Sequence, residues 1–380
     1  MSEKFRDTLW HIEVSDIEKK KSFWQRLPDL AKSKPLVLYG MGDGADKLLK
    51  QLAILGIEPA GIFASDEFVR GQSFAGMPVL TYAQARERFG EMLVLVCFGT
   101  EQPEVLANIN KIAAEQELYA PHMPLFGNLL ADGEFWRQYK TDLAAAAEVW
   151  ADAASRAVYI NYLHYMWTGR IDFLQLVTTP RAAIWPLLAL KSDEVYLDLG
   201  AYDGDTVLEF VDLVRDSWRQ IWALEPDNRN FAKLQARLNG LPNTRALPLA
   251  IYQHSGDLSF RGLAGRNSAL AQPNGSADKT VAVKKQYTVS GISLDDLQRQ
   301  YMDKPPTFIK MDVEGAEEQA LLGGREMLAQ YQPRLAVAAY HRTEDIFKLP
   351  LLLKQFNPNY RLYLRHHPYI PGWETNIYAV

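Results

Sequence analysis

The sequence predicts an α/β fold, with a Rossmann-like doubly wound sheet and an antiparallel last strand preceded by a smaller Rossmann-like domain. Three observations support it. A strand, a glycine turn and a helix are expected at 35–56 and again from 195 onward. Polar residues follow several apolar runs of the C-terminal half, where doubly wound sheets bind ligands. The two β-rich runs that come last, YRLYLRHH and TNIYAV, predict the antiparallel pair.

The composition is that of an ordinary globular protein. The chain has 380 residues, enough for two domains, and 48% of them are hydrophobic and 23% charged. Its formal net charge of −5 gives no general attraction to nucleic acid or to anionic membranes. No apolar run approaches the length of a membrane span, and the first 21 residues are too charged for a signal peptide. We therefore expect a cytoplasmic protein without a membrane span.

The single cysteine bears on the compartment as well. Cys97 lies inside the apolar run LVLVCFGT, so a disulfide within the chain is excluded. A buried thiol in a reducing cytoplasm is the expectation.

The N-terminal half predicts a small Rossmann-like unit. A strand is followed by a turn through Gly40 and Gly42 and by a helix, and the next strand ends near Asp66. A further strand, helix and strand are expected from FAGMPVLTYAQAR and EMLVLVCFGT. The motifs resemble the half-Rossmann units that precede sugar-modifying acyltransferases. This resemblance implies that Gly40, Gly42 and Asp66 hold a sugar nucleotide; a fold kept for docking or dimerisation is the alternative.

The segment that follows predicts helices rich in aromatic residues. These residues are Trp150, Tyr159, Tyr162, Tyr165 and Trp167. Aromatic residues at helical spacing indicate packing in a core or between domains. A cap that closes over an acceptor, with His164 as a hydrogen-bonding residue, is the alternative.

The run VYLDLGAYDGDT carries the strongest signal of a ligand site. It predicts a buried strand that turns through Gly200 and Gly204 into a helix whose first N–H groups are exposed. Asp198 lies at the end of the strand. Glu225 ends the next apolar run, where an acid in a βαβ unit pairs with ribose hydroxyls, and Pro226 stops that strand.

Two later strands bring polar residues to the same edge of the sheet. The run TFIKMDVEGAEE predicts a strand that ends in Lys310, Asp312 and Glu314, and RLAVAAYH predicts one that ends at Tyr340 and His341. Lys310 and Asp312 are two residues apart and share a face, so the lysine is expected to keep the carboxylate ionised.

Together, DLGAYDGDT, the strand-end Glu225 and IKMDVEGAEE resemble the FkbM family of S-adenosylmethionine-dependent methyltransferases, over roughly 151–380. The resemblance implies a class I methyltransferase sheet, S-adenosyl-L-methionine as cofactor and a hydroxyl acceptor on a sugar or natural product. The expected cofactor-binding residues are Asp198, Gly200, Ala201, Tyr202, Asp203, Gly204, Thr206, Glu225, Pro226 and Asp312. Tyr202 replaces the Asn of many members, and Tyr340–His341 replaces the more usual acid two places before His.

The predicted organisation has three parts. They are an N-terminal Rossmann-like domain at 1–130, a helical linker or cap at 131–190 and a methyltransferase domain at 191–380. Within the last part, TRALPLAIYQ predicts the third strand, 256–290 a β-ribbon with the acceptor loop or hairpin tip GLAGRNSAL, and SLDDLQRQY a helix. His366 and His367 are expected at the surface or rim.

Methyl transfer to a hydroxyl requires removal of its proton. His341 is the first candidate for the base because imidazole titrates near neutral pH, and Asp312, supported by Lys310, is the second. Asp312 and Glu317 are alternatively helix-capping acids. A metal held by Asp312 and Glu314 lacks a third ligand with clear spacing, so metal-free catalysis is favoured.

The expected partner is a small-molecule or carbohydrate acceptor and not a nucleic acid, and homo-oligomerisation is left open. Two other functions stay open. One is a non-catalytic protein that binds S-adenosylmethionine or a sugar nucleotide. The other is a dinucleotide-dependent oxidoreductase, although GMGDGAD lacks the last glycine of the full fingerprint.

Overall fold

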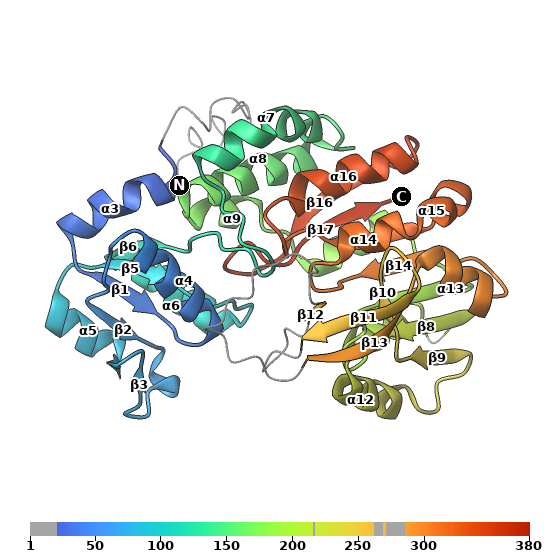
Figure 1. The fold of residues 1–380 in the computed structure, drawn as a ribbon, viewed down its shortest axis with the longest axis horizontal. Helices are drawn as coiled ribbons and strands as arrows, with labels where there is room; N and C mark the ends of the chain where they lie inside the picture. Colours follow the sequence, from blue (N-terminus) through green and yellow to red (C-terminus); the bar gives the residue numbers. More distant parts are fainter. Residues whose placement is uncertain (1–20, 216, 262–268, 271–285) are drawn as a thin grey trace. The chain divides into compact units, whose positions relative to one another are not determined.

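The structure, a computed structural model, describes residues 21–215, 217–261, 269–270 and 286–380. These residues form two compact units (Figure 1). Unit 1 comprises 21–148, 152–180 and 364–375, and unit 2 comprises the described residues of 149–151, 181–363 and 376–380. The helices within residues 133–177, which follow the N-terminal sheet, belong to unit 1.

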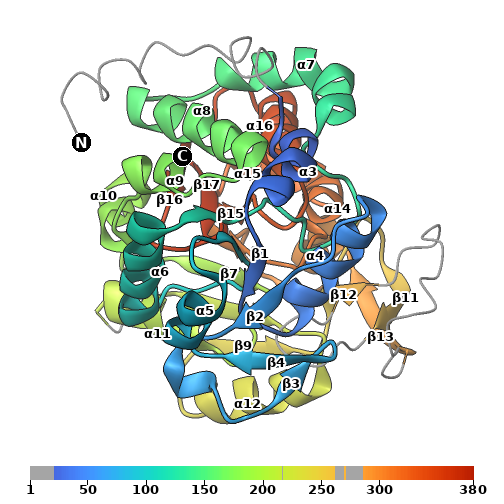
Figure 2. The same cartoon turned by 90° about the vertical axis from the view of Figure 1, so that its left-hand side faces the viewer.

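Unit 1 is built on a six-stranded sheet in the order β3-β4-β2-β1-β5-β6. Its strands are β1 Leu36–Tyr39, β2 Gly61–Phe63, β3 Ser73–Phe74, β4 Met77–Leu80, β5 Leu93–Val96 and β6 Glu117–Tyr119. All pairs are parallel except β3 with β4. Figure 2 shows β1, β2, β4 and β3 following one another across this sheet. Since β1 and β5 are buried at every position, their apolar runs reflect cover on both faces.

Unit 1 has seven α-helices within the described residues. They are α3 Phe23–Ser33, α4 Asp43–Ile54, α5 Tyr82–Phe89, α6 Pro103–Glu115, α7 Gly133–Ala147, α8 Ala153–Thr168 and α9 Asp172–Val177, with the 3-10 turn η1 Asp66–Phe68. Helix α8 begins at the side-chain cap of Asp152 and ends at Gly169, whose φ is +68°. Tyr159, Tyr162, Tyr165 and Trp167 on α8 are buried, which confirms the packing interpretation for these aromatic residues.

Unit 2 contains the seven-stranded sheet β16-β17-β15-β14-β7-β8-β9, apart from the residues of β16 and β17 that fall within 364–375. Its strands are β7 Val195–Leu199, β8 Gln220–Leu224, β9 Thr244–Leu247, β14 Phe308–Met311, β15 Arg334–Ala338, β16 Leu362–His366 and β17 Thr375–Ala379. The five strands from β9 to β15 run parallel, and β17 is antiparallel to β15. This confirms the predicted doubly wound sheet with an antiparallel last strand.

The helices of unit 2 pack on both faces of this sheet. They are α10 Trp185–Leu188, α11 Asp205–Leu213, α12 Asn228–Leu238, α13 Leu294–Tyr301, α14 Glu317–Leu322, α15 Arg325–Tyr331 and α16 Asp345–Phe356, with the 3-10 turn η2 Arg181–Ile184. On β8, Ile221 and Ala223 share a core with Phe210 of α11, whereas Trp222 contacts Tyr301 of α13. Successive side chains of β8 thus pack against helices on opposite faces of the sheet. No helix within the described ranges has the length and apolarity to span a bilayer.

The predicted third strand is divided between two sheets. TRALPLAIYQ forms β9 and then β10 Ala250–Ile251, which pairs with β13 Gln286–Ile292 in the four-stranded sheet β10-β13-β11-β12. Pro248 follows β9 and has no N–H to continue the ladder. The β-ribbon prediction is confirmed, because β11 Gly256–Arg261 pairs antiparallel with β13. Of the loop GLAGRNSAL, only β12 Ala269–Leu270 lies within the described residues.

The helix predicted in SLDDLQRQY is α13, and the Ser293 side chain caps it by accepting the Asp296 N–H. In contrast, the expectation that His366 and His367 lie at the surface is wrong. Both are buried, with Nδ1 of His366 2.9 Å from Thr375 Oγ1 and Nδ1 of His367 2.9 Å from the Thr179 carbonyl. All five residues of β16 are buried, so this strand has no solvent face.

A buried ion pair ties the start of β15 to the loop before β7. Glu194 is 1% exposed, and both of its carboxylate oxygens contact Nη2 of Arg334, at 2.5 and 2.6 Å. We predict that Arg334→Met lowers the free energy of unfolding by about 3 kcal/mol, because it leaves the Glu194 charge buried without its partner. Urea denaturation measures this change.

The matched control is Arg219→Met, which removes an exposed guanidinium 4.0 Å from the exposed Asp193 carboxylate. It is expected to change stability little. Equal effects of the two substitutions would contradict the assignment.

Candidate active site

The turn after β7 is shaped by its contact with the neighbouring strand. A Cβ at Gly200 would lie 1.9 Å from the backbone oxygen of Asp312, and the φ of Gly200 is +76°. The carbonyl of Asp312 therefore occupies the position that a side chain at 200 would take. Tyr202 also has a positive φ, of +49°, and Gly204, at +92°, precedes α11. The glycine at 200 is therefore required for the close approach of β7 and β14.

Glu225 lies directly beside this turn. Its Oε2 accepts the N–H of Tyr202 at 3.0 Å, and its Oε1 accepts the N–H of Asp227 at 2.9 Å. The residue is 7% exposed. Burial raises the pKa of Glu225 to about 7, against the opposing effect of the two backbone N–H donors. The carboxylate is thus fixed in direction, and its charge changes near neutral pH.

Asp198 lies underneath the turn. It is fully buried, and its Oδ2 accepts hydrogen bonds from Tyr196 Oη at 3.1 Å and Thr206 Oγ1 at 2.5 Å. Lys310 Nζ lies 3.4 Å from Asp198 Oδ1 and donates to the Gly200 carbonyl at 3.1 Å. The two residues are paired in the register of β7 with β14. Asp198 therefore ties together a strand, the turn and a helix.

The other predicted residues of this motif have different surroundings. Ala201 is buried, and Pro226 lies between Glu225 and Asp227. Asp203 forms an ion pair of 2.7 Å with Arg237 of α12. Its side chain thus joins the turn to a helix.

A cluster of carboxylates surrounds His341 at the end of β15. His341 is 2% exposed, and its Nδ1 lies 2.8 Å from Glu317 Oε1. Its Nε2 faces Asp312 Oδ1 at 3.4 Å and Glu314 Oε2 at 3.6 Å. The Tyr340 hydroxyl donates to Asp312 Oδ2 at 3.4 Å. Residues from β14, α14 and β15 are therefore brought together.

These carboxylates change the protonation state of His341. Burial by itself lowers the pKa of this imidazole, but the charges of Glu317, Asp312 and Glu314 outweigh burial and raise it to about 10. This shift favours the protonated form of His341, for which the sequence predicts titration near neutral pH.

Helix capping does not explain the position of Asp312. Helix α14 starts after Ala316 without a side-chain cap, and Glu317 accepts the N–H of Val313 at 2.9 Å through Oε1. Glu317 thus bonds the preceding turn, as a capping acid does, and contacts His341 through the same oxygen. Glu314 has a φ of +54°, a strained value for a residue other than glycine.

One member of this cluster, Asp345, is not evident from the sequence pattern. Asp345 is 1% exposed and accepts the N–H of Arg342 at 2.8 Å through Oδ2. Burial, followed by the charge of Glu317, raises the pKa of Asp345 well above its usual range. In the sequence, RTEDIF indicates only an acid at the start of a helix, which is common without a site.

The glycine turn of unit 1 differs from that of unit 2. A Cβ at Gly40 would lie 2.3 Å from the ring of Phe98, so an aromatic side chain occupies the position beside the turn. Asp43 and Asp46 in the first turn of α4 disfavour an anion, and Asp66 is exposed in η1. Phe98 thus lies beside Gly40, whereas nothing lies within 4 Å of a Cβ at Gly42, and the binding of a sugar nucleotide stays a prediction.

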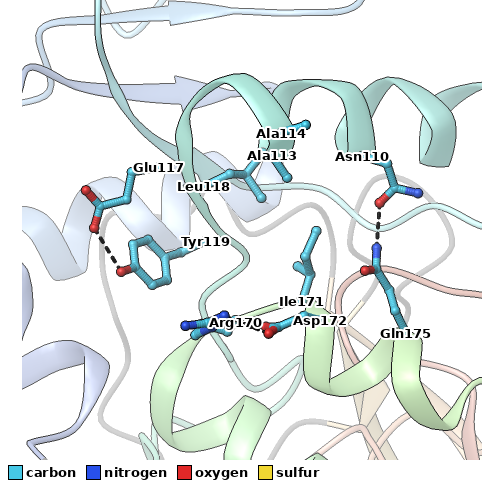
Figure 3. A pocket seen from close by; sticks show the side chains of 10 residues that line it. All are labelled: Asn110, Ala113, Ala114, Glu117, Leu118, Tyr119, Arg170, Ile171, Asp172 and Gln175. Carbon is cyan, nitrogen blue, oxygen red and sulfur yellow. Dashed lines mark hydrogen bonds and ion pairs between the residues drawn. The ribbon is translucent and has the colours of Figure 1, made fainter. Parts of the chain in front are cut away.

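Unit 1 also contains a pocket of 540 Å³ between α6, β6 and the corner that joins α8 to α9 (Figure 3). Polar groups on its wall already contact each other. Arg170 pairs with Asp172 at 2.7 Å, and Gln175 bonds Asn110. None of the predicted site residues lines this pocket.

Comparisons with known proteins show which fold the chain shares and which family model part of it resembles. The crystal structure of Methyltransferase FkbM from Methylobacillus flagellatus KT aligns with 99% of this chain and 98% of its own, with a TM-score of 0.70 and 19% identity. This match shows a shared fold, of the α/β methyltransferase class. Residues 198–371 match the family model described as the Methyltransferase FkbM domain.

A curated relative is the 2-O-methyltransferase NoeI from Sinorhizobium fredii (strain NBRC 101917 / NGR234), which is 29% identical over 150 residues. The match covers 37% of this chain and 61% of NoeI, so the chain spans less than two thirds of that relative. Residues 198–371 are therefore similar to an FkbM methyltransferase domain.

The contact between Gly200 and Asp312 can be tested by substitution. We predict that Gly200→Ala lowers the thermal unfolding midpoint far more than Gly240→Ala does. Both glycines have a positive φ, of +76° and +89°, so each alanine has a conformational cost of about 1–2 kcal/mol. Only the Cβ at 200 meets backbone, since nothing lies within 4 Å of a Cβ at 240. Equal unfolding midpoints of the two variants would show that β7 and β14 can move apart without loss of stability.

Proposed function

We propose that this chain transfers a methyl group from S-adenosyl-L-methionine to a hydroxyl of a sugar-containing or natural-product acceptor. The observation that carries the proposal is that Glu225 and the carboxylate cluster around His341 both lie at one edge of the unit 2 sheet. Glu225 follows β8, and the cluster of Asp312 and His341 follows β14 and β15. Strand order reverses between β7 and β14, which is where doubly wound sheets bind their ligands.

The donor set beside the turn suits an adenosyl group. A carboxylate accepts about four hydrogen bonds, and the two oxygens of Glu225 each accept one from the backbone. Lone pairs remain for the two hydroxyls of a ribose. When bound, S-adenosylmethionine supplies a methyl group activated on a sulfonium. The protein has to align the acceptor oxygen with that methyl and exclude water.

Removal of the hydroxyl proton is assigned to Asp312. Both ring nitrogens of the buried His341 face carboxylates, whereas the Asp312 side chain is 33% exposed and can reach an acceptor. His341 Nε2 at 3.4 Å and Lys310 Nζ at 4.0 Å are the cations beside it. In this proposal His341 positions the carboxylate, and Glu317 positions His341. General-base catalysis of this kind contributes about 10²–10⁴-fold.

The acceptor class is supported by the relative. NoeI is named a 2-O-methyltransferase, which favours an oxygen acceptor. The net charge of −5 disfavours a nucleic-acid substrate.

The cofactor assignment predicts a pH-dependent affinity. Ribose hydroxyls donate to the ionised carboxylate, so binding favours the deprotonated Glu225, whose pKa in the free protein is about 7. The affinity for S-adenosylmethionine should therefore rise roughly tenfold from about pH 6 to 8 and then level off. Isothermal titration calorimetry measures this affinity. A separate titration with NAD tests the alternative ligand.

Two substitutions make this test specific. Glu225→Gln should bind more weakly and without the pH dependence. If Glu225→Ala keeps the affinity of the natural sequence, the carboxylate does not hold the ribose. Binding of NAD in place of S-adenosylmethionine would contradict the proposed function.

The catalytic assignment predicts a separation of binding from turnover. Asp312→Asn and His341→Ala should lower kcat, by about 10²–10⁴-fold for Asp312→Asn, with a much smaller change in S-adenosylmethionine affinity. Transfer of labelled methyl to a panel of sugar-containing acceptors measures turnover. Glu318→Gln, on the same helix as Glu317, is the control and should keep activity. Full activity of Asp312→Asn would assign proton removal to another group.

A further inference from the structure

The cluster at the end of β15 has the composition of a metal site. We propose that Asp312, Glu317 and His341 bind a divalent transition-metal ion. Each of the three residues offers one donor atom, and these atoms all lie within 4.8 Å of one another. From the sequence, only Asp312 and Glu314 are expected as ligands, and metal-free catalysis is favoured. The fold supplies the missing ligands, because it brings α14 and β15 to the end of β14.

The spacing of the donor atoms fits one ion. Transition-metal ions hold imidazole nitrogen and carboxylate oxygen at about 2.0–2.2 Å, so two donors on opposite sides of one ion are about 4.4 Å apart. Donor atoms that lie up to 4.8 Å apart therefore need only small side-chain movements to bind the same ion. Asp312 is 33% exposed and has room to make such a movement.

Glu317 gives independent support. Its side chain is fully buried, and Oε1 accepts from Val313 and contacts His341. Its other oxygen, Oε2, is buried without a hydrogen-bond partner in the part of the chain that the structure describes. An unsatisfied buried carboxylate oxygen is costly, and a bound cation removes that cost. The carboxylate that contacts the imidazole thus has a free coordination position.

The balance of charge also favours a cation. Three carboxylates, those of Asp312, Glu314 and Glu317, act on the one imidazole of His341. Two neighbouring cations have other contacts as well. Lys310 is closer to Asp198, at 3.4 Å, than to Asp312, at 4.0 Å, and the Arg342 side chain donates to the Gly315 carbonyl at 2.6 Å. A divalent ion neutralises the excess negative charge.

The ligand types restrict the kind of ion. Imidazole suits zinc, iron, nickel and copper, whereas carboxylates suit magnesium, calcium and manganese. One imidazole with two carboxylates therefore favours a transition metal over magnesium or calcium. Mn²⁺ is the probe of choice because it tolerates both ligand types and is paramagnetic.

The role of the ion deepens the proposed function and rests on it. A divalent ion beside an acceptor hydroxyl lowers the pKa of that hydroxyl. If one oxygen of Asp312 binds the ion, the other remains available for the proton. The existence of the site, however, is tested without methyl transfer.

To test this, the full chain is first treated with a chelator, and the chelator is then removed. The protein is titrated with Mn²⁺ alone, and electron paramagnetic resonance follows the binding. We expect one saturable Mn²⁺ per chain, displaced by Zn²⁺. Asp312→Asn and Glu317→Gln should each weaken Mn²⁺ binding by at least tenfold, and the control Glu318→Gln should bind as the natural sequence does. Circular dichroism checks that each variant is folded.

Asp312→Asn keeps the test decisive if the buried Glu317→Gln variant fails to fold. The proposal is overturned if the natural sequence has no saturable Mn²⁺ or Zn²⁺ site, or if folded Asp312→Asn binds Mn²⁺ equally well. Calorimetry with S-adenosylmethionine on the same samples separates the two hypotheses. Cofactor binding without metal binding contradicts the metal site alone, and metal binding without cofactor binding contradicts the methyl-transfer proposal alone.

Discussion

The close approach of β7 and β14 is the constraint on which the candidate site depends. The carbonyl of Asp312 lies where any side chain at position 200 would begin, so only glycine allows the two strands to end side by side. That contact sets the turn through Tyr202, which in turn bonds the Glu225 carboxylate. It also fixes the backbone from which the Asp312 side chain reaches His341. One backbone contact thus positions both the proposed cofactor residue and the proposed acceptor residues.

The electrostatics of the site follow from burial among like charges. Taking several carboxylates out of water is unfavourable unless protons or cations accompany them. Here the protonated form of His341 is favoured, and so is the neutral form of Asp345. A metal ion would meet the same demand for positive charge. The site is therefore best understood as a group of acids that shares a small number of positive charges.

Much of this architecture could be predicted from the sequence, because it rests on local patterns. Apolar runs, glycine turns and strand-end acids identify β7, β8, β14 and β15 and their common edge. What could not be predicted depends on distances through space. Asp345 looks like an ordinary helix-start acid, and the protonation of His341 depends on Glu317, which is distant in the sequence. Likewise, only the structure shows Phe98 beside Gly40.

The division of the chain between the two units has a consequence for its biogenesis. Unit 1 takes its last segment, 364–375, from between the final two strands of the sheet in unit 2. Neither unit is therefore a continuous stretch of polypeptide, and a cut at any single peptide bond cannot release one of them intact. During synthesis on the ribosome, the first unit stays incomplete until nearly all of the second has been translated.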